Sequence, residues 1–244
     1  MKNPRLFVDQ PLNVDDLVEL NRDASKYMTR VLRRATGEAL TLFNGDGMNY
    51  PATLAETTGK NALVRIVARQ PNQTQSPLNI TLVQSLAKGI KLDLVIQKAS
   101  ELGVARISPV SADRSVLQLE NKRVDTRMEH WRGVAISACT QCHRSTLPDI
   151  GRPQTFKQWL AHSGDIKNRF LLHPTANYSL ASVPHPGTEC CVIVGPEGGF
   201  SDHEIATAAD QGITRVSCGP RVLRTETAGF TALAILQSRF GDLN

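Results

Sequence analysis

The sequence predicts an α/β protein with a small β-rich domain followed by a larger domain built on a mainly parallel sheet. Three features support this. Short apolar runs separated by turn residues fill the first seventy or so positions. Residues 70–77 are polar, flanked by proline and without periodicity, as expected of a linker. Strand-like and helix-like runs then alternate to the end, which is typical of parallel sheets.

In the first part we expect strands at 40–43, 51–56 and 62–67 and one helix at about 23–33. The segment Asn44-Gly-Asp-Gly47 predicts a tight turn, because Asn-Gly and Asp-Gly tolerate positive φ. Strands this short and this close together indicate a small barrel. We therefore place one domain at residues 1–72 and a second at 73–244.

In the second part a strand at 78–86, a helix at 91–102 and a strand at 105–110 form a βαβ unit. Leu94, Val95 and Leu102 should supply the apolar face of that helix. Further helices are expected at 121–142, 202–211 and 225–240, and strands at 169–172, 190–194 and 214–218. Cys190 and Cys191 are adjacent in a strand, so their side chains should point to opposite faces.

Bulk properties exclude several classes of protein. The chain has 244 residues, 28 Lys and Arg against 23 Asp and Glu, and a net charge of +5, which permits a polyanionic partner without requiring one. No run is long and apolar enough to span a membrane, and no export signal is evident, so we expect a cytoplasmic protein. The five cysteines then predict neither disulfides nor a metal site, and the haem-like pattern Cys139-Thr-Gln-Cys142-His143 is set aside because haem attachment of that kind needs export.

Three strand ends open into unusual loops, and ligands of parallel sheets bind at such ends. They are Leu171-Leu-His-Pro174, Val194-Gly-Pro-Glu-Gly-Gly199 and Cys218-Gly-Pro-Arg-Val-Leu-Arg-Thr-Glu-Thr227. The glycines of the second loop let backbone approach a ligand closely, although a turn that needs glycine for shape alone is equally compatible. Ser201-Asp-His-Glu204 should cap the following helix.

In the third loop, Arg221, Arg224 and Glu226 crowd beside an apolar helix. They either pair with one another as a cap of that helix or face a ligand.

Gly195-Pro-Glu-Gly-Gly199, with Ser201 and Glu204, and Gly219-Pro-Arg-Val-Leu-Arg-Thr-Glu-Thr-Ala228 together resemble the SPOUT methyltransferase superfamily, and within it the RsmE family of small-subunit ribosomal RNA uridine N3-methyltransferases. Segments such as Lys98-Ala-Ser-Glu-Leu-Gly103 and Gln141-Cys-His-Arg144 extend the resemblance over nearly the whole chain. Thr140 departs from the family pattern, which usually has Glu there, and Tyr27 and Met28 lie where a His is expected.

The resemblance implies an N-terminal PUA-like RNA-binding β-barrel, a C-terminal SPOUT domain with a trefoil knot, a homodimer, and S-adenosyl-L-methionine as the cofactor. The activity implied is methylation of N3 of a uridine in small-subunit (16S) ribosomal RNA. Alternatives are a SPOUT enzyme acting on another RNA and a non-catalytic RNA-binding or ribosome-assembly factor. By position, the implied cofactor-binding residues are Leu172, His173, Val194, Gly195, Glu197, Gly198, Gly199, Cys218, Gly219, Val222, Leu223 and Thr225.

The chemistry of that reaction suggests catalytic candidates. The N3 proton must be removed or the resulting anion stabilised, so we expect Arg224 first and Arg221 second as anion stabilisers. Glu197 or Glu226 could act as a base or orient an arginine. Arg22, Lys26, Arg30 and Arg33 would share one face of the first helix and contact RNA phosphates, or form an ordinary solvated face. Arg5, Arg114 and Arg144 are further RNA-binding candidates from the family-like segments.

Overall fold

The computed structural model describes residues 3–58, 61–86, 92–115 and 124–243. The chain divides into two compact units. Unit 1 contains Met1–Gln75 and Cys139–Leu147, and unit 2 contains Ser76–Ala138 and Pro148–Asn244. The segment Cys139–Leu147 therefore belongs with the N-terminal residues, although it lies far along the sequence.

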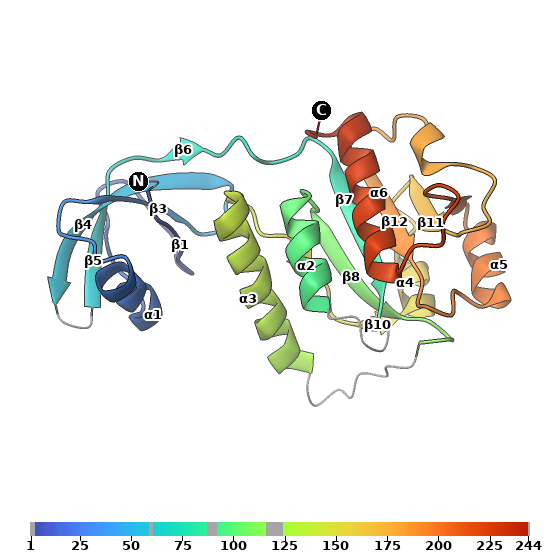
Figure 1. Ribbon diagram of the computed structural model, residues 1–244, viewed down its shortest axis with the longest axis horizontal. Coiled ribbons are helices and arrows are strands. Elements are labelled where there is room, and N and C mark those ends of the chain that lie inside the picture. The colour runs from blue at the N-terminus through green and yellow to red at the C-terminus, as the bar shows by residue number, and fades with distance from the viewer. Residues whose placement is uncertain (1–2, 59–60, 87–91, 116–123, 244) are drawn as a thin grey trace. The chain divides into compact units, whose positions relative to one another are not determined.

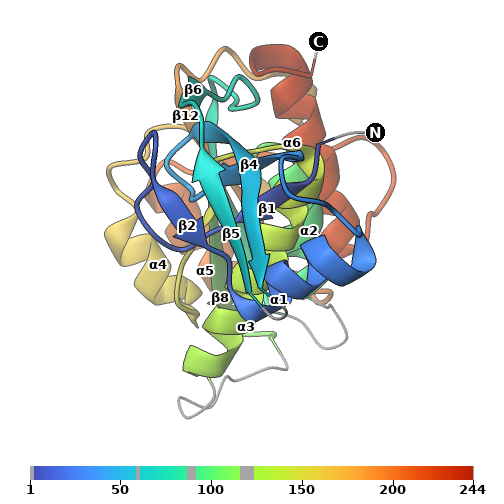
Figure 2. The ribbon, with the colours of Figure 1, turned by 90° about the vertical axis from the view of Figure 1, so that its left-hand side faces the viewer.

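Unit 1 is built on a six-stranded sheet with the order β1-β3-β4-β5-β2, and β6 pairs with β4. Only β1 and β3 pair in parallel; the other pairs are antiparallel. Figure 2 shows β4 and β5 as the long strands of this unit. The strands are β1 (Arg5–Phe7), β2 (Leu17–Glu19), β3 (Ala39–Phe43), β4 (Met48–Thr58), β5 (Asn61–Ile66) and β6 (Gln70–Pro71).

The β-rich character of unit 1 is confirmed, with two differences. The strand path ends at β1 and β2, so among the described residues pairing does not close the sheet into a complete barrel. Gln70 and Pro71, which we expected in the linker, pair with Asn49 and Met48 instead. Leu40, Leu42, Val64 and other buried residues form the hydrophobic core of this unit.

The single helix expected at 23–33 was wrong in type and length. The segment is an α-helix, α1 (Arg22–Lys26), followed by a π-helix at Tyr27–Val31. Asn21 caps the start by accepting a hydrogen bond from the Ala24 amide. Met28 is fully buried in the core of the unit, while Arg33 adopts positive φ, so helical backbone ends before it.

Unit 2 is built on an all-parallel seven-stranded sheet with the order β10-β8-β7-β12-β11-β13, and β9 pairs with β8. Figure 1 shows its helices and strands. Strands are β7 (Asn79–Ser85), β8 (Arg106–Ser111), β9 (Asp149–Ile150), β10 (Gln154–Thr155), β11 (Arg169–Leu172), β12 (Glu189–Val194) and β13 (Thr214–Val216). Helices are α2 (Leu92–Glu101), α3 (Val124–Cys142), α4 (Phe156–His162), α5 (Asp202–Asp210) and α6 (Thr225–Phe240), with a short 3-10 turn at Leu180–Ser182.

Two apolar cores cover the two faces of this sheet. One joins α2, α6 and the part of α3 that lies in unit 2, and the other joins α4 and α5. Cys190 lies in the first core and Cys191 in the second, which confirms that their side chains point to opposite faces. The βαβ unit is confirmed. Of the predicted apolar face, Val95 is buried and Leu102 packs partly buried against the core, but Leu94 is 42% exposed. Leu92, Ile96 and Ala99 complete the buried face of α2.

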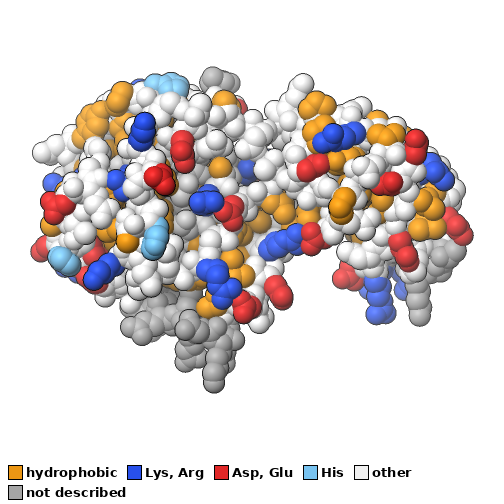
Figure 3. Space-filling view, turned by 180° about the vertical axis from the view of Figure 1, so that it is seen from behind, with side chains coloured by type: hydrophobic (Ala, Val, Ile, Leu, Met, Phe, Trp, Pro, Cys, Tyr) orange, Lys and Arg blue, Asp and Glu red, His pale blue; other side chains and the backbone are white. Residues whose placement is uncertain are grey.

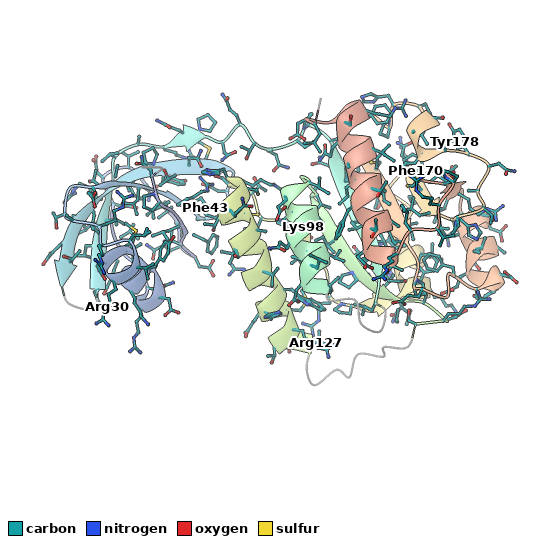
Figure 4. The ribbon with its side chains drawn as sticks, in the orientation of Figure 1. Arg30, Phe43, Lys98, Arg127, Phe170 and Tyr178 are labelled. Carbon is teal, nitrogen blue, oxygen red and sulfur yellow. The ribbon has the colours of Figure 1, made fainter. Side chains whose placement is uncertain are left out.

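None of the described helices is long and apolar enough to cross a membrane. Trp131 and Trp159 are both buried in the cores of unit 2. Figure 4 shows Phe170 on β11, inside the sheet of unit 2.

Candidate active site in unit 2

The carboxyl ends of β12, β11 and β13 lie side by side, because these strands are neighbours in the sheet and run parallel. The three loops that follow them line one pocket of about 820 Å3. That volume lies within the range of roughly 300–1,000 Å3 typical of small-molecule sites. The pocket therefore occupies the place where ligands of parallel sheets usually bind.

Each residue that the sequence predicted for cofactor binding or catalysis lines this pocket. They come from three separate stretches of chain, 172–173, 194–199 and 218–226. Pro174 and Asp202, which the sequence placed in the first loop and in the cap of the following helix, also line it. Sequence reasoning did not single out Thr175, Phe200 and Ile205, which carry no motif and are recognised by their place in the fold.

The first loop is held by backbone. The His173 amide donates to the Val216 carbonyl at 2.9 Å, which joins the end of β11 to the end of β13. Nδ1 of His173 lies 3.1 Å from the Thr175 hydroxyl and accepts from the Thr175 amide at 3.3 Å. The imidazole thus supports its own loop, as expected of a residue that lines the site.

The second loop needs its glycines for steric reasons. A Cβ on Gly195 would lie 3.1 Å from the ring of Phe200, a buried residue stacked on Phe156. Gly199 has φ +68°, a left-handed conformation that disfavours other residues, and its amide closes a turn on the Pro196 carbonyl at 2.8 Å. The capping box of α5 is confirmed, with the Ser201 hydroxyl and the Glu204 carboxylate each accepting from the other's amide.

The third loop leads into α6. The backbone of Arg224 is the N-cap of α6, but its side chain makes no capping hydrogen bond. Among the described residues neither Arg221 nor Arg224 forms an ion pair with Glu226. An Arg–Glu cap of this helix is therefore not formed, and both guanidinium groups belong to exposed residues that line the pocket.

Charges at the pocket are balanced between three arginines and three carboxylates. The arginines are Arg114, Arg221 and Arg224, and the carboxylates are Glu197, Asp202 and Glu226. Leu172, Val194 and Leu223 give part of the wall an apolar character. Burial raises the pKa of the Cys218 thiol to about 11, so this thiol stays neutral at physiological pH and is no nucleophile.

The residues predicted to bind RNA divide into three groups. Arg22, Lys26, Arg30 and Arg33 are exposed on unit 1, and Figure 4 shows Arg30 pointing away from the strands of that unit. Arg114 is in unit 2 and lines the pocket. Figure 3 shows basic side chains mixed with acidic ones on the face opposite to Figure 1.

Arg5 and Arg144 are 9% and 3% exposed. The Arg5 guanidinium donates to Asn49 Oδ1, to the Arg144 carbonyl and to Ser145 Oγ at 2.7, 3.0 and 2.6 Å. It also lies 4.3 Å from the centre of the Phe43 ring. These bonds from Arg5 fasten Cys139–Leu147 within unit 1. Both side chains are buried, and the RNA contact expected of Arg5 and Arg144 stays a prediction.

Among the described residues, no group of three or more His, Cys, Asp or Glu side chains is placed to hold a metal ion. Cys139 is buried, and its thiol donates to the Thr146 carbonyl. The hydrogen bond with Cys142 and then burial raise the pKa of the Cys139 thiol, so it stays neutral and acts as a packing residue.

Comparison with known proteins identifies the family. A family model described as RNA methyltransferase domain matches residues 74–237, and one described as RNA methyltransferase PUA domain matches residues 20–67. The ribosomal RNA small subunit methyltransferase E of Buchnera aphidicola from Schizaphis graminum is 30% identical over 99% of this chain and 98% of its own length. The chain belongs to this RNA methyltransferase family.

Solved structures agree with the assignment. A methyltransferase from Legionella pneumophila, in complex with the bound cofactor SAM, has a TM-score of 0.91 and 36% identity over 99% of this chain and 100% of that chain. Ribosomal RNA small subunit methyltransferase E from Neisseria gonorrhoeae, bound to S-adenosyl methionine, has a TM-score of 0.91 and 32% identity over the full length of both chains. The two-part architecture of these RNA methyltransferases is thus shared by this chain.

Proposed function

We propose that this RNA methyltransferase uses S-adenosylmethionine to methylate N3 of a uridine in small-subunit ribosomal RNA. The observation that carries the proposal is the convergence of three loops, on β11, β12 and β13, upon one pocket. Relatives named ribosomal RNA small subunit methyltransferase E support ribosomal RNA as the substrate, and the similar structure bound to S-adenosyl methionine supports the cofactor.

The residues present suit this cofactor. The pocket is large enough for a nucleoside with an amino-acid tail, and its apolar wall can receive an adenine ring. Gly198, Gly199 and Gly219 offer backbone groups without obstructing side chains, while Glu197, Asp202 and Glu226 are anions that suit a sulfonium. The cofactor supplies an electrophilic methyl group. The chain must bind the cofactor, orient it toward the acceptor atom and exclude water.

The remaining chemistry concerns the acceptor. Uridine N3 carries a proton at neutral pH, so the site must remove it or stabilise the anion that its loss leaves on the ring. Arg224 and Arg221 are the proposed anion stabilisers, because a guanidinium donates hydrogen bonds to developing negative charge on carbonyl oxygens. Glu197 or Glu226 is the proposed base or the residue that orients an arginine. N3 lies on the pairing edge, so the uridine must be unpaired or extruded.

The same proposal includes the organisation of the protein. Residues 1–72 are the proposed RNA-binding PUA-like domain, and residues 73–244 are the proposed methyltransferase domain, apart from Cys139–Leu147, which clusters with unit 1. The C-terminal part of the methyltransferase domain carries the proposed trefoil knot. Arg22, Lys26, Arg30 and Arg33 contact RNA phosphates from unit 1. The enzyme works as a homodimer in the cytoplasm, where its ribosomal substrate is located. The two family models that match this chain, at residues 20–67 and 74–237, support the division into these two domains.

Two experiments test the proposal. Titration calorimetry of the purified chain with S-adenosylmethionine should show uptake, and a non-catalytic RNA-binding factor should show none. Mass mapping of ribosomal RNA from cells lacking the protein should reveal one uridine that has lost a methyl group at N3. A fully methylated small-subunit RNA in those cells would contradict the substrate assignment.

Arg224→Ala separates catalysis from binding. We expect methyl transfer to fall by about 100-fold or more, as when one electrostatic stabiliser of a transition state is lost, while cofactor uptake is retained. Unchanged turnover would remove Arg224 from the mechanism. Arg215→Ala, which removes an exposed arginine of β13 outside the pocket, is the matched control.

A further inference from the structure

A fourth strand end contributes to the pocket. After β8, residues 112–115 form a turn in which the Ser115 amide donates to the Ala112 carbonyl and the Ala112 amide donates to Ser115 Oγ, both at 2.9 Å. Arg114 lies in this turn and lines the pocket. In the sheet, β7 separates β8 from β12, so the turn reaches the second loop from across one strand.

A buried carboxylate attaches this turn to the start of α5. Glu204 is 8% exposed. Its Oε2 accepts from the Ser201 amide at 2.8 Å, and its Oε1 accepts from the Asp113 amide at 2.9 Å. The Ser201 hydroxyl also donates to Asp113 Oδ2 at 2.7 Å. A buried carboxylate is costly unless its oxygens are paired, so this arrangement holds the turn in one position.

Arg114 extends the connection to the glycine-rich loop. Its Nη1 donates to the Gly198 carbonyl at 3.0 Å. A Cβ on Gly198 would lie 3.6 Å from Cβ of Arg114, so the two backbones are close. Glu197 and Gly198 form the exposed tip of the loop. The contact from Arg114 is therefore an external support for a tip that is otherwise closed only by the turn on Pro196.

We propose that Arg114 is a positioning residue that holds the Gly195–Gly199 loop in its cofactor-binding shape, and that Glu204 acts through it by fixing the turn that carries it. This inference rests on the proposed function, because it takes the pocket to be the cofactor site. It replaces the RNA contact expected for Arg114 with a role that operates before any RNA is bound.

The test uses the full chain and S-adenosylhomocysteine, titrated calorimetrically without RNA. Arg114→Ala should raise the Kd for this ligand by about 3- to 10-fold, a range that corresponds to the loss of one charge-assisted hydrogen bond at a partly exposed site. Arg114→Lys, which keeps a donor and the charge, should recover part of the affinity. Arg106→Ala, an exposed arginine at the other end of β8 that pairs with Asp149, should leave the Kd unchanged.

A second set of variants separates positioning from folding. Glu204→Gln keeps one acceptor oxygen and should raise the Kd less than Glu204→Ala does. Because Glu204 acts through Arg114, the double variant Arg114→Ala/Glu204→Gln should bind no more weakly than Arg114→Ala alone. Independent, multiplying effects of the two substitutions on Kd would overturn the role given to Glu204. Melting temperatures of the same samples report any loss of folded protein.

The outcomes distinguish this inference from the proposed function. If the unaltered chain takes up no S-adenosylhomocysteine, the cofactor assignment fails and the inference fails with it. If the unaltered chain and Arg114→Ala bind it equally, while only the KM for RNA rises in Arg114→Ala, the inference alone is overturned and Arg114 is an RNA contact.

Discussion

Oε1 of Gln84 lies 3.1 Å from the position that a Cβ on Gly229 would occupy, so α6 and β7 meet where the helix has no side chain. Gln84 is fully buried, and Leu82 lines the same contact. The last helix of the chain therefore packs on the central strand of the sheet through a glycine. Because this contact is close, we expect the free energy of unfolding to depend strongly on the volume of the side chain at position 229.

Gly229→Leu should lower the free energy of unfolding by about 1–3 kcal/mol, the usual cost of overpacking a filled core. Gly133→Leu is the matched control, because Gly133 is a helical glycine of α3 with no heavy atom within 4 Å of its added Cβ. That substitution should be neutral or stabilising by up to about 1 kcal/mol, since leucine favours helix over glycine. Urea unfolding measures the change in unfolding free energy for both variants. Equal changes would contradict the close packing of α6 on β7 at Gly229.

Gln237 anchors α6 at its other end. It is fully buried; its Oε1 accepts from the Ser76 hydroxyl at 2.7 Å, and its Nε2 donates to the Leu102 carbonyl at 3.0 Å. Gln237→Ala should cost about 2–4 kcal/mol, because it leaves two buried polar groups unpaired and a cavity. Gln97→Ala, on the exposed side of α2, should change the free energy of unfolding by less than about 0.5 kcal/mol. A small effect of Gln237→Ala in the same urea titration would refute this anchoring role.

The buried thiols predict alkaline sensitivity. Burial raises the pKa of Cys190 to about 12 from an ordinary value of 9.0. Above pH 9 the unfolded chain loses this proton while the folded chain keeps it, so stability falls as pH rises from about 9 toward 12. One thiol contributes a slope of up to about 1.4 kcal/mol per pH unit to the plot of unfolding free energy against pH. When this free energy is measured by urea unfolding between pH 8 and 11, the plot should be shallower for Cys190→Ala than for the unaltered chain. Identical slopes would rule out this contribution.

The glycine-rich loop should be intolerant of a methyl group at its start. In Gly195→Ala the new Cβ must displace the Phe200 ring, which is stacked on Phe156 at 4.5 Å between ring centres. We expect the Kd for S-adenosylhomocysteine to rise by about 5-fold or more, because displacement of Phe200 shifts the pocket wall. Gly164→Ala, which meets no atom within 4 Å, is the control. Unchanged affinity in Gly195→Ala would show that the ring can move aside freely.

The basic residues of unit 1 should govern the salt dependence of RNA binding. Lys26→Glu and Arg30→Glu together should weaken binding of a small-subunit RNA fragment and flatten the plot of log affinity against log salt, because fewer counterions are released. Arg65→Glu, at an exposed residue on β5, introduces half of that change of charge elsewhere on the unit, so the shifts are compared per unit of charge. If the double variant and the control shift affinity and slope equally, Lys26 and Arg30 form only a solvated surface.

The sequence identified the pocket because its loops are marked by glycine and proline at strand ends, a local signal. The sequence did not reveal that Arg114 supports the loop, because Arg114 and Gly198 are 84 positions apart. No sequence motif contains both residues. Strands of two or three residues, such as β2 and β9, are too short for periodicity to detect. The π-helix at Tyr27–Val31 has the composition of an ordinary helix, so its wider hydrogen bonding leaves no signal in the sequence.

The wall of the pocket formed by Cys218–Ala228 has a consequence for biogenesis. A ribosome makes this wall after every other part of the pocket, so a growing chain that stops short of Ala228 has no complete chamber. Truncated products of interrupted translation would accordingly be unable to sequester the methyl donor. The pocket is therefore complete only once the first turn of α6 has been made.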